Sequence, residues 1–163
     1  MRKIKYLLLF ICVAGCVSAC KKDLDFENFD VEGQFKKDTT AIRAFAVANN
    51  IPVIKDPKYN IFYQILAPGD GADVVVNSLS SIKVTYTGRL LDGTTFETNT
   101  TPTDYFSLGG MITGWQAGIP LIKKKGGKIR LLLPSFYGYG NVPNGPIPAN
   151  SVLDFDVQLV DVK

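Results

Sequence analysis

The only tryptophan of the chain, Trp115, lies in the segment GGMITGWQAGIPLI, which has four glycines, one proline and no charged residue. A helix that served packing alone would normally use residues with a higher helix propensity than glycine. A tryptophan side chain also offers a large flat apolar surface to a bound group. We therefore predict that Trp115 forms the floor of an open apolar pocket, and that this pocket carries the function.

Several kinds of chemistry are excluded by the residues that the chain lacks. It contains no histidine, which removes histidine-based catalytic triads and the usual zinc sites. Its three cysteines all lie within the first 20 residues, and it has neither a phosphate-binding Gly-Lys-Ser/Thr loop nor a dinucleotide fingerprint after a strand. We expect the protein to work without covalent or metal chemistry.

The N-terminus is typical of an exported protein. A basic start, MRKIK, precedes an apolar stretch that is too short for a membrane span and ends in VSAC. This resembles a bacterial lipoprotein signal peptide over residues 1–19, with Cys20 as the lipidated first residue of the mature chain. The sequence VAGC makes Cys16 an alternative, but cleavage before Cys20 leaves a hydrophobic region of normal length. An ordinary secretory signal is the other interpretation.

Cleavage at Cys20 changes the charge of the protein. Three of the 18 basic residues lie before Cys20, whereas none of the 15 acidic residues does, so the formal charge of +3 falls to 0. A neutral chain gives no electrostatic support for a nucleic-acid partner. The mature domain would also have no disulfide, so its stability must come from its core.

Residues 20–58 are predicted to form a membrane tether that contains a short helix over about 39–50. Asp38 or Thr39 can cap this helix, and Asn50 with Pro52 can end it. We expect the helix to pack on the domain or to space it from the membrane. A partner-binding or dimerising helix is the alternative, although its apolar stripe is narrow.

Residues 59–163 are predicted to form one domain of antiparallel strands. Alternating apolar and polar residues and an Asp-Gly turn indicate strands, and Gly114 to Ile122 is the one plausible helix, which Pro120 limits in length. The expected fold class is α+β, a curved antiparallel sheet wrapped around one short helix. The strand segments are IFYQIL, SIKVTYTG, RLLDGTTFE, DYFSL, GGKIRLLLP and SVLDFDVQLVDV.

The motifs VTYTGRLLDGTTFE, FSLGGMITGWQAGIPLIKKKGGKIRLLLP and YGYG…IPANSVLDFDVQLVDV occur in this order. Together they resemble the FKBP-type peptidyl-prolyl cis-trans isomerases. The resemblance is strong over residues 82–162 and looser over residues 59–81. It implies an isomerase that acts on proline-containing polypeptides, that macrolide inhibitors can bind, and that needs no metal, nucleotide or redox cofactor.

The resemblance also implies which residues form the site. The positions that match catalytic residues of the family are Tyr86, Phe96, Glu97, Trp115 and Tyr139. Those that match substrate-binding residues are Met111, Ile112, Ile147 and Phe155.

Three features depart from the family pattern. A pocket aromatic common in the family aligns with Asp104, so either Tyr105 takes its place or this wall is more polar. The stretch from Gly109 to Trp115 is also short, and Glu97 stands where the family usually has aspartate.

The leading hypothesis is therefore a lipid-anchored prolyl isomerase that assists the folding of exported proteins outside the cytoplasm. The alternative is a chaperone or assembly lipoprotein with negligible turnover, in which the same pocket binds proline-containing segments. A purely structural lipoprotein is a third possibility, and it predicts that neither peptides nor macrolides bind.

Overall fold

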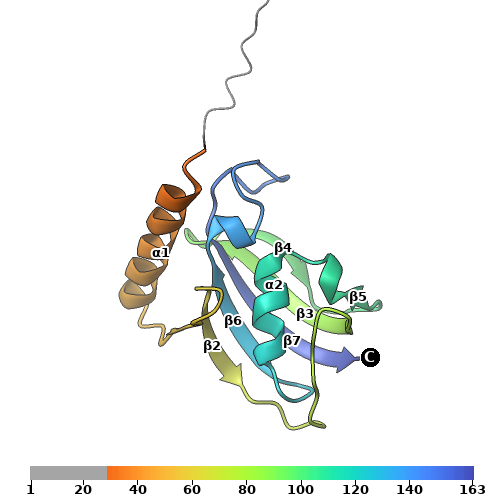
Figure 1. Cartoon of the computed structure of the whole chain (residues 1–163). Coiled ribbons are helices and arrows are strands. Elements are labelled where there is room, and N and C mark those ends of the chain that lie inside the picture. The colour runs from red at the N-terminus through yellow and green to blue at the C-terminus, as the bar shows by residue number, and fades with distance from the viewer. Residues whose placement is uncertain (1–28) are drawn as a thin grey trace, which may run out of the picture.

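The computed structural model describes residues 29–163, so the predicted signal peptide and Cys20 lie outside the described part of the chain. A seven-stranded antiparallel sheet dominates the fold, with the order β1-β2-β6-β7-β3-β4 and β5 paired to the first two residues of β3 (Figure 1). This confirms the predicted α+β class. The strands are β1 (Ile54–Lys55), β2 (Phe62–Ala67), β3 (Ser81–Leu90), β4 (Thr95–Asn99), β5 (Phe106–Ser107), β6 (Lys128–Leu133) and β7 (Leu153–Val162).

Within residues 29–163, two α-helices and three short 3-10 turns accompany the sheet. Helix α2 lies across one face of the sheet, while α1 runs along its β2–β6 side (Figure 1). The predicted helix from Gly114 to Ile122 is split in two, because an α-helical turn passes at Gly118 into a 3-10 turn that contains Pro120. The helices are α1 (Val31–Ala48) and α2 (Thr113–Gly118), and the 3-10 turns are η1 (Leu108–Gly110), η2 (Ile119–Leu121) and η3 (Ser135–Tyr137).

The two helices cover opposite faces of the sheet. On β6, Leu131 and Leu133 belong to the main core that includes Trp115, whereas Leu132 belongs to a second cluster with Ile42 of α1. Neighbouring residues of a strand point to opposite faces, so these memberships place α1 and α2 on the two sides of β6. The sheet therefore has two cores, a large one under α2 and a small one under α1.

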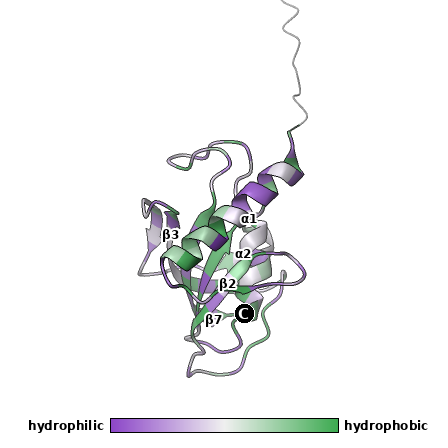
Figure 2. Ribbon diagram, turned by 90° about the vertical axis from the view of Figure 1, so that its left-hand side faces the viewer, coloured by the Kyte–Doolittle hydropathy of each residue, from purple (hydrophilic) through white to green (hydrophobic). Residues whose placement is uncertain are grey.

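Helix α1 is longer than predicted. It begins eight residues before the expected start, where the Asp30 carboxylate accepts a hydrogen bond from the Gly33 amide at 2.7 Å. The predicted caps at Asp38 and Thr39 are therefore wrong, and both residues are buried inside the helix. The N-terminal half of α1 is mostly hydrophilic and the C-terminal half mostly hydrophobic (Figure 2), which is why only the second half gave an apolar pattern.

Packing on the domain was one of the roles expected for this segment, and the structure shows it for α1. The helix packs on the sheet, with Ile42 fully buried against a cluster that contains Phe62, Leu132 and Val152. Within residues 29–163, no helix is long and apolar enough to cross a membrane.

Close contact between α2 and β6 explains the glycines around Trp115. A β-carbon on Gly114 would lie 2.4 Å from Leu133 Cδ1, and one on Gly118 would lie 2.5 Å from Leu131 Cδ2. Real β-carbons do not approach other atoms so closely, so a larger residue at either position would force the facing leucine or the helix to shift. The poor helix formers in this segment therefore serve the close approach of helix and sheet.

We expect Gly114→Ala to lower the free energy of unfolding by about 1–3 kcal/mol, because overpacking outweighs the better helix propensity of alanine. Urea denaturation measures the change. Leu133→Val shortens the side chain that alanine would meet, so the double variant should lose less stability than the two single losses combined. An alanine variant more stable than the parent would show that the contact is not tight.

Candidate active site

An open cavity of about 250 Å³ lies between α2, the sheet and the loop that follows η3. Segments far apart in the sequence contribute to it, including β3, β4, β5, the N-terminus of α2 and the first residues of β7 near Phe155. The residues that line it are Tyr86, Glu97, Phe106, Met111, Ile112, Trp115, Tyr139 and Phe155.

Aromatic rings packed edge to face form the floor of this cavity. The Trp115 ring centroid lies 5.0 Å from that of Tyr86 and 5.4 Å from that of Phe155, with interplanar angles of 85° and 80°. Such perpendicular contacts add to the stability that area burial alone provides. Trp115 is only 4% exposed, so its indole is held in place as part of this floor.

A glycine on β3 makes room for this aromatic floor. A β-carbon on Gly88 would lie 2.5 Å from the Phe96 ring and 2.7 Å from the Phe155 ring. These two phenyl rings meet edge to face, with centroids 5.5 Å apart. Phe96 thus supports Phe155 from behind and is not one of the lining residues.

One side of the cavity is polar. The Tyr86 hydroxyl donates to Glu97 Oε1 at 2.7 Å. Burial, and then the hydrogen bond to Glu97, raise the pKa of Tyr86, and burial followed by the negative charge of Glu97 raises the pKa of Tyr139. Both tyrosines therefore keep their hydroxyl protons well into the alkaline range.

The N-terminus of α2 offers a backbone donor beside the cavity. Ile112 is the N-cap residue of α2, and its amide makes no hydrogen bond to any residue in the described part of the chain. The Gln116 side chain holds the preceding turn by donating to the carbonyl of Met111 at 2.8 Å and to that of Gly109 at 3.2 Å. A carbonyl oxygen entering the cavity can therefore accept from a positioned amide.

Seven of the nine predicted site residues line this cavity, and Phe96 and Ile147 do not. Ile147 is 4% exposed and packs in the main core, where its amide and carbonyl both bond to Asn144. The predicted roles of the nine residues remain hypotheses.

Phe106 is the aromatic wall residue that the sequence reasoning missed. Tyr105, considered for this place, points elsewhere, because its ring lies beside the ammonium groups of Lys83 and Lys163 and its hydroxyl donates to Asp161. Asp104 is exposed and does not make the wall polar. Strand alternation was the available signal, since it places Phe106 on the same face as the buried Leu108.

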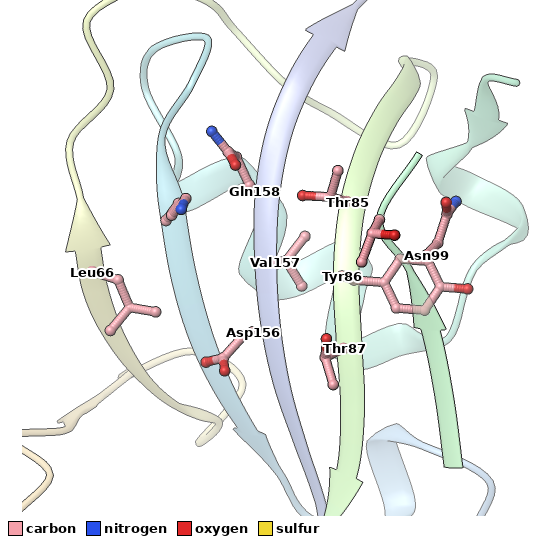
Figure 3. Close-up of a pocket in the computed structure, with 10 residues that line it drawn as sticks. Leu66, Thr85, Tyr86, Thr87, Asn99, Asp156, Val157 and Gln158 are labelled. Atoms are coloured by element: carbon pink, nitrogen blue, oxygen red, sulfur yellow. The ribbon is translucent and has the colours of Figure 1, made fainter. Parts of the chain in front are cut away.

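A second, shallower hollow lies on the other face of the sheet and does not fit the predicted chemistry. Thr85 and Thr87 of β3 and Asp156 and Gln158 of β7 project into it (Figure 3). It contains no stacked aromatic floor, and Asp156 is already paired with Arg89 at 2.8 Å. Across residues 29–163, no group of three or more acidic, histidine or cysteine residues is arranged to hold a metal ion.

The curved sheet, the short helix α2 on one of its faces and the aromatic cavity between them define the class of prolyl isomerases with the FKBP fold. Residues 73–160 match the family model of the FKBP-type peptidyl-prolyl cis-trans isomerases, and the chain belongs to this family. The predicted family resemblance is thereby confirmed.

Two relatives illustrate the extent of the similarity. The chain is 38% identical over 112 residues to the FKBP-type peptidyl-prolyl cis-trans isomerase FkpA of Escherichia coli, which covers 68% of this chain and 40% of the relative. The chain thus spans about two fifths of that relative. The crystal structure of FkpA from Escherichia coli superposes with a TM-score of 0.61 at 33% identity, covering 81% of this chain and 64% of the other. A peptidyl-prolyl cis-trans isomerase from Pseudomonas syringae gives a TM-score of 0.64 at 30% identity, covering 78% and 95%.

Proposed function

We propose that this protein catalyses the cis–trans isomerisation of X–Pro bonds in other polypeptides. The rotation is slow because amide resonance creates a barrier of about 18–20 kcal/mol, and uncatalysed exchange takes tens of seconds or longer. The observation that carries the proposal is the cavity of about 250 Å³, which has Trp115 and Phe155 in its wall. The flat apolar surface that these two side chains give the cavity suits a pyrrolidine ring.

Catalysis would follow from binding the twisted amide more tightly than the planar one. The planar amide is the more dipolar state, and the apolar wall of the cavity solvates that dipole poorly. The Tyr139 hydroxyl and the Ile112 amide are the donors available to substrate carbonyls. No proton needs to be transferred, so the absence of histidine is no obstacle.

The decisive experiment is the refolding of a reporter protein whose slow phase is limited by prolyl isomerisation. Substoichiometric amounts of the protein should accelerate that phase in proportion to its concentration. Acceleration only at stoichiometric amounts, with saturable binding of proline peptides, would instead support the alternative of a chaperone without turnover. A macrolide inhibitor that quenches Trp115 fluorescence and abolishes the acceleration would assign both effects to this cavity.

The pH dependence gives a further prediction. We expect kcat/KM to change less than about twofold between pH 8 and pH 10, because the pKa values of Tyr86 and Tyr139 are raised from the ordinary 10.0 and both hydroxyls stay protonated. A protease-free NMR exchange assay with a proline peptide measures the rate. An activity that falls through an apparent pKa near 9 would contradict the role of these hydroxyls.

We also propose that the protein is exported and anchored to a bacterial membrane through lipid on Cys20. The basic and apolar N-terminal sequence and the VSAC motif support this proposal. Labelling with a radioactive fatty acid in the native host should be lost in Cys20→Ala and kept in Cys16→Ala. The reverse pattern would move the anchor to Cys16, and labelling of neither form would indicate an ordinary secretory signal.

A further inference from the structure

A buried carboxylate joins α1 to the loop that carries Tyr139. Asp38 is 3% exposed, and its Oδ2 atom accepts from the Ser135 amide at 2.8 Å and from the Ser135 hydroxyl at 2.6 Å. Its Oδ1 atom accepts from the Gln34 side-chain amide at 2.6 Å. No ion pair involves Asp38 within residues 29–163. Burial of a carboxylate is costly unless such donors are well placed, so this contact fixes the distance between α1 and Ser135.

Ser135 in turn organises the turn that leads to the cavity. Its carbonyl accepts from the amides of Gly138 and Gly140, each at 2.9 Å, and the Gly140 carbonyl accepts from the Asn150 amide at 2.8 Å. Tyr139 lies between the two glycines and lines the cavity. The backbone around Tyr139 is thus tied to the residue that Asp38 holds.

A second contact between α1 and the same turn is aromatic. The Phe35 ring of α1 meets the Tyr137 ring edge to face, with centroids 6.0 Å apart. The far part of the loop has no comparable support, because residues 141–146 are exposed. Helix α1 therefore supports the loop specifically at the turn that presents Tyr139.

We propose that Asp38 is a positioning residue of the active site, through which α1 fixes the loop that places the Tyr139 hydroxyl. The inference rests on the proposed isomerase function and assigns to the N-terminal helix a part in it. Asp38 acts at a distance from the substrate, through Ser135, and does not itself line the cavity.

The first test compares kinetic parameters of single and double variants. Asp38→Ala should lower kcat/KM about 10-fold, mainly through kcat, because a small displacement of a positioned donor is costly. If Asp38 acts through Tyr139, Asp38→Ala should cause little further loss in a Tyr139→Phe background. Asp38→Asn keeps one oxygen acceptor for Ser135 and should restore part of the activity. Full additivity with Tyr139→Phe would overturn the proposal.

Ile42→Ala is the matched control, since Ile42 is buried on the same helix but belongs to the cluster with Phe62 and Leu132. At a temperature at which all variants are folded, Ile42→Ala should lose stability and keep kcat/KM within about twofold. An equal loss of activity in Ile42→Ala would mean that only the general stability of the helix matters, and the proposal would fail.

Hydrogen exchange tests the same inference without measuring activity. In Asp38→Ala, the amides of Gly138, Gly140 and Asn150 should exchange about 10-fold faster or more, while those of β6 and β7 keep their relative protection. Uniform acceleration throughout the sheet would overturn the proposal. If the parent protein failed to accelerate refolding, the isomerase function would be rejected, whereas the exchange pattern would still decide whether Asp38 fixes this loop.

Discussion

Replacement of Arg130 by methionine is expected to lower the free energy of unfolding by about 3–5 kcal/mol, because it leaves a buried carboxylate without its cation. Arg130 donates to the two oxygens of Asp154 at 2.8 Å and 2.6 Å, and Asp154 is only 2% exposed. The hydrogen bonds that Arg130 donates to Asp154 raise the pKa of Arg130 above its usual value. The guanidinium also lies 5.8 Å from the centroid of the Phe45 ring, so α1 covers the pair.

Chemical denaturation of the parent, of Arg130→Met and of the double variant with Asp154→Leu measures the effect. The double variant should regain part of the stability, because removal of both charges also removes the desolvation penalty. Arg89→Met is the matched control, since Arg89 and Asp156 form a partly exposed pair on the same face of the sheet with side-chain exposures of 29% and 37%. Arg89→Met should lower the free energy of unfolding by no more than about 1 kcal/mol. Equal losses of stability in Arg130→Met and Arg89→Met would show that the burial of Asp154 does not add to the cost of removing its partner.

Strand alternation predicted most of the strands of the sheet, but it did not predict that α1 packs on the second face. Alternation in SVLDFDVQLVDV puts Leu153, Phe155, Val157 and Leu159 on one side of β7, and all four are buried. It puts Asp154 on the polar side, which would ordinarily face water, but Asp154 is buried because α1 covers that end of the strand. Periodicity reports which residues share a face and carries no information about what packs on it.

The wrongly predicted start of α1 shows that helical patterns, too, do not report what packs on a helix. The second half of the helix has the apolar spacing that predicts burial, whereas Asp38 in the first half resembles an N-cap from its residue type alone. Its partner Ser135 is 97 residues away, so no local pattern could reveal that this carboxylate is buried. The only local hint was its spacing, three residues after Phe35 and four before Ile42, which puts Asp38 on the same helix face as these two apolar residues.

The candidate site was predictable to the extent that it depends on ordered motifs. The motifs gave Trp115, Tyr86 and Tyr139, and the structure brings all three to one cavity. The wall residue Phe106 escaped because family alignment pointed to Asp104 and Tyr105, whereas the pairing of Ile82 with Phe106 sets which side chain faces the cavity. Alternation within one strand gives its two faces, and the register with the neighbouring strand decides which of them meets the cavity.

Trp115→Leu is expected to lower kcat/KM about 30-fold, which corresponds to about 2 kcal/mol of lost transition-state contact. The indole supplies the flat surface of the cavity, and leucine is apolar but smaller and not planar. Trp115→Phe keeps a planar ring and should lie between the parent and Trp115→Leu. The refolding assay and the NMR exchange assay, each run where the variants are folded, measure the order.

The same substitutions distinguish a role of Trp115 in catalysis from a role in core packing alone. Trp115 contacts both Tyr86 and Phe155, so both variants lose stability through the cavity that they leave. Ile129→Val is a suitable control, because Ile129 is fully buried in the same core and does not line the cavity. Its catalysis should remain close to that of the parent despite lower stability. If kcat/KM fell in proportion to stability in Trp115→Leu, Trp115→Phe and Ile129→Val, Trp115 would be a core residue only. If kcat/KM instead followed the size and planarity of the side chain at position 115, the indole would be the surface that contacts the substrate proline.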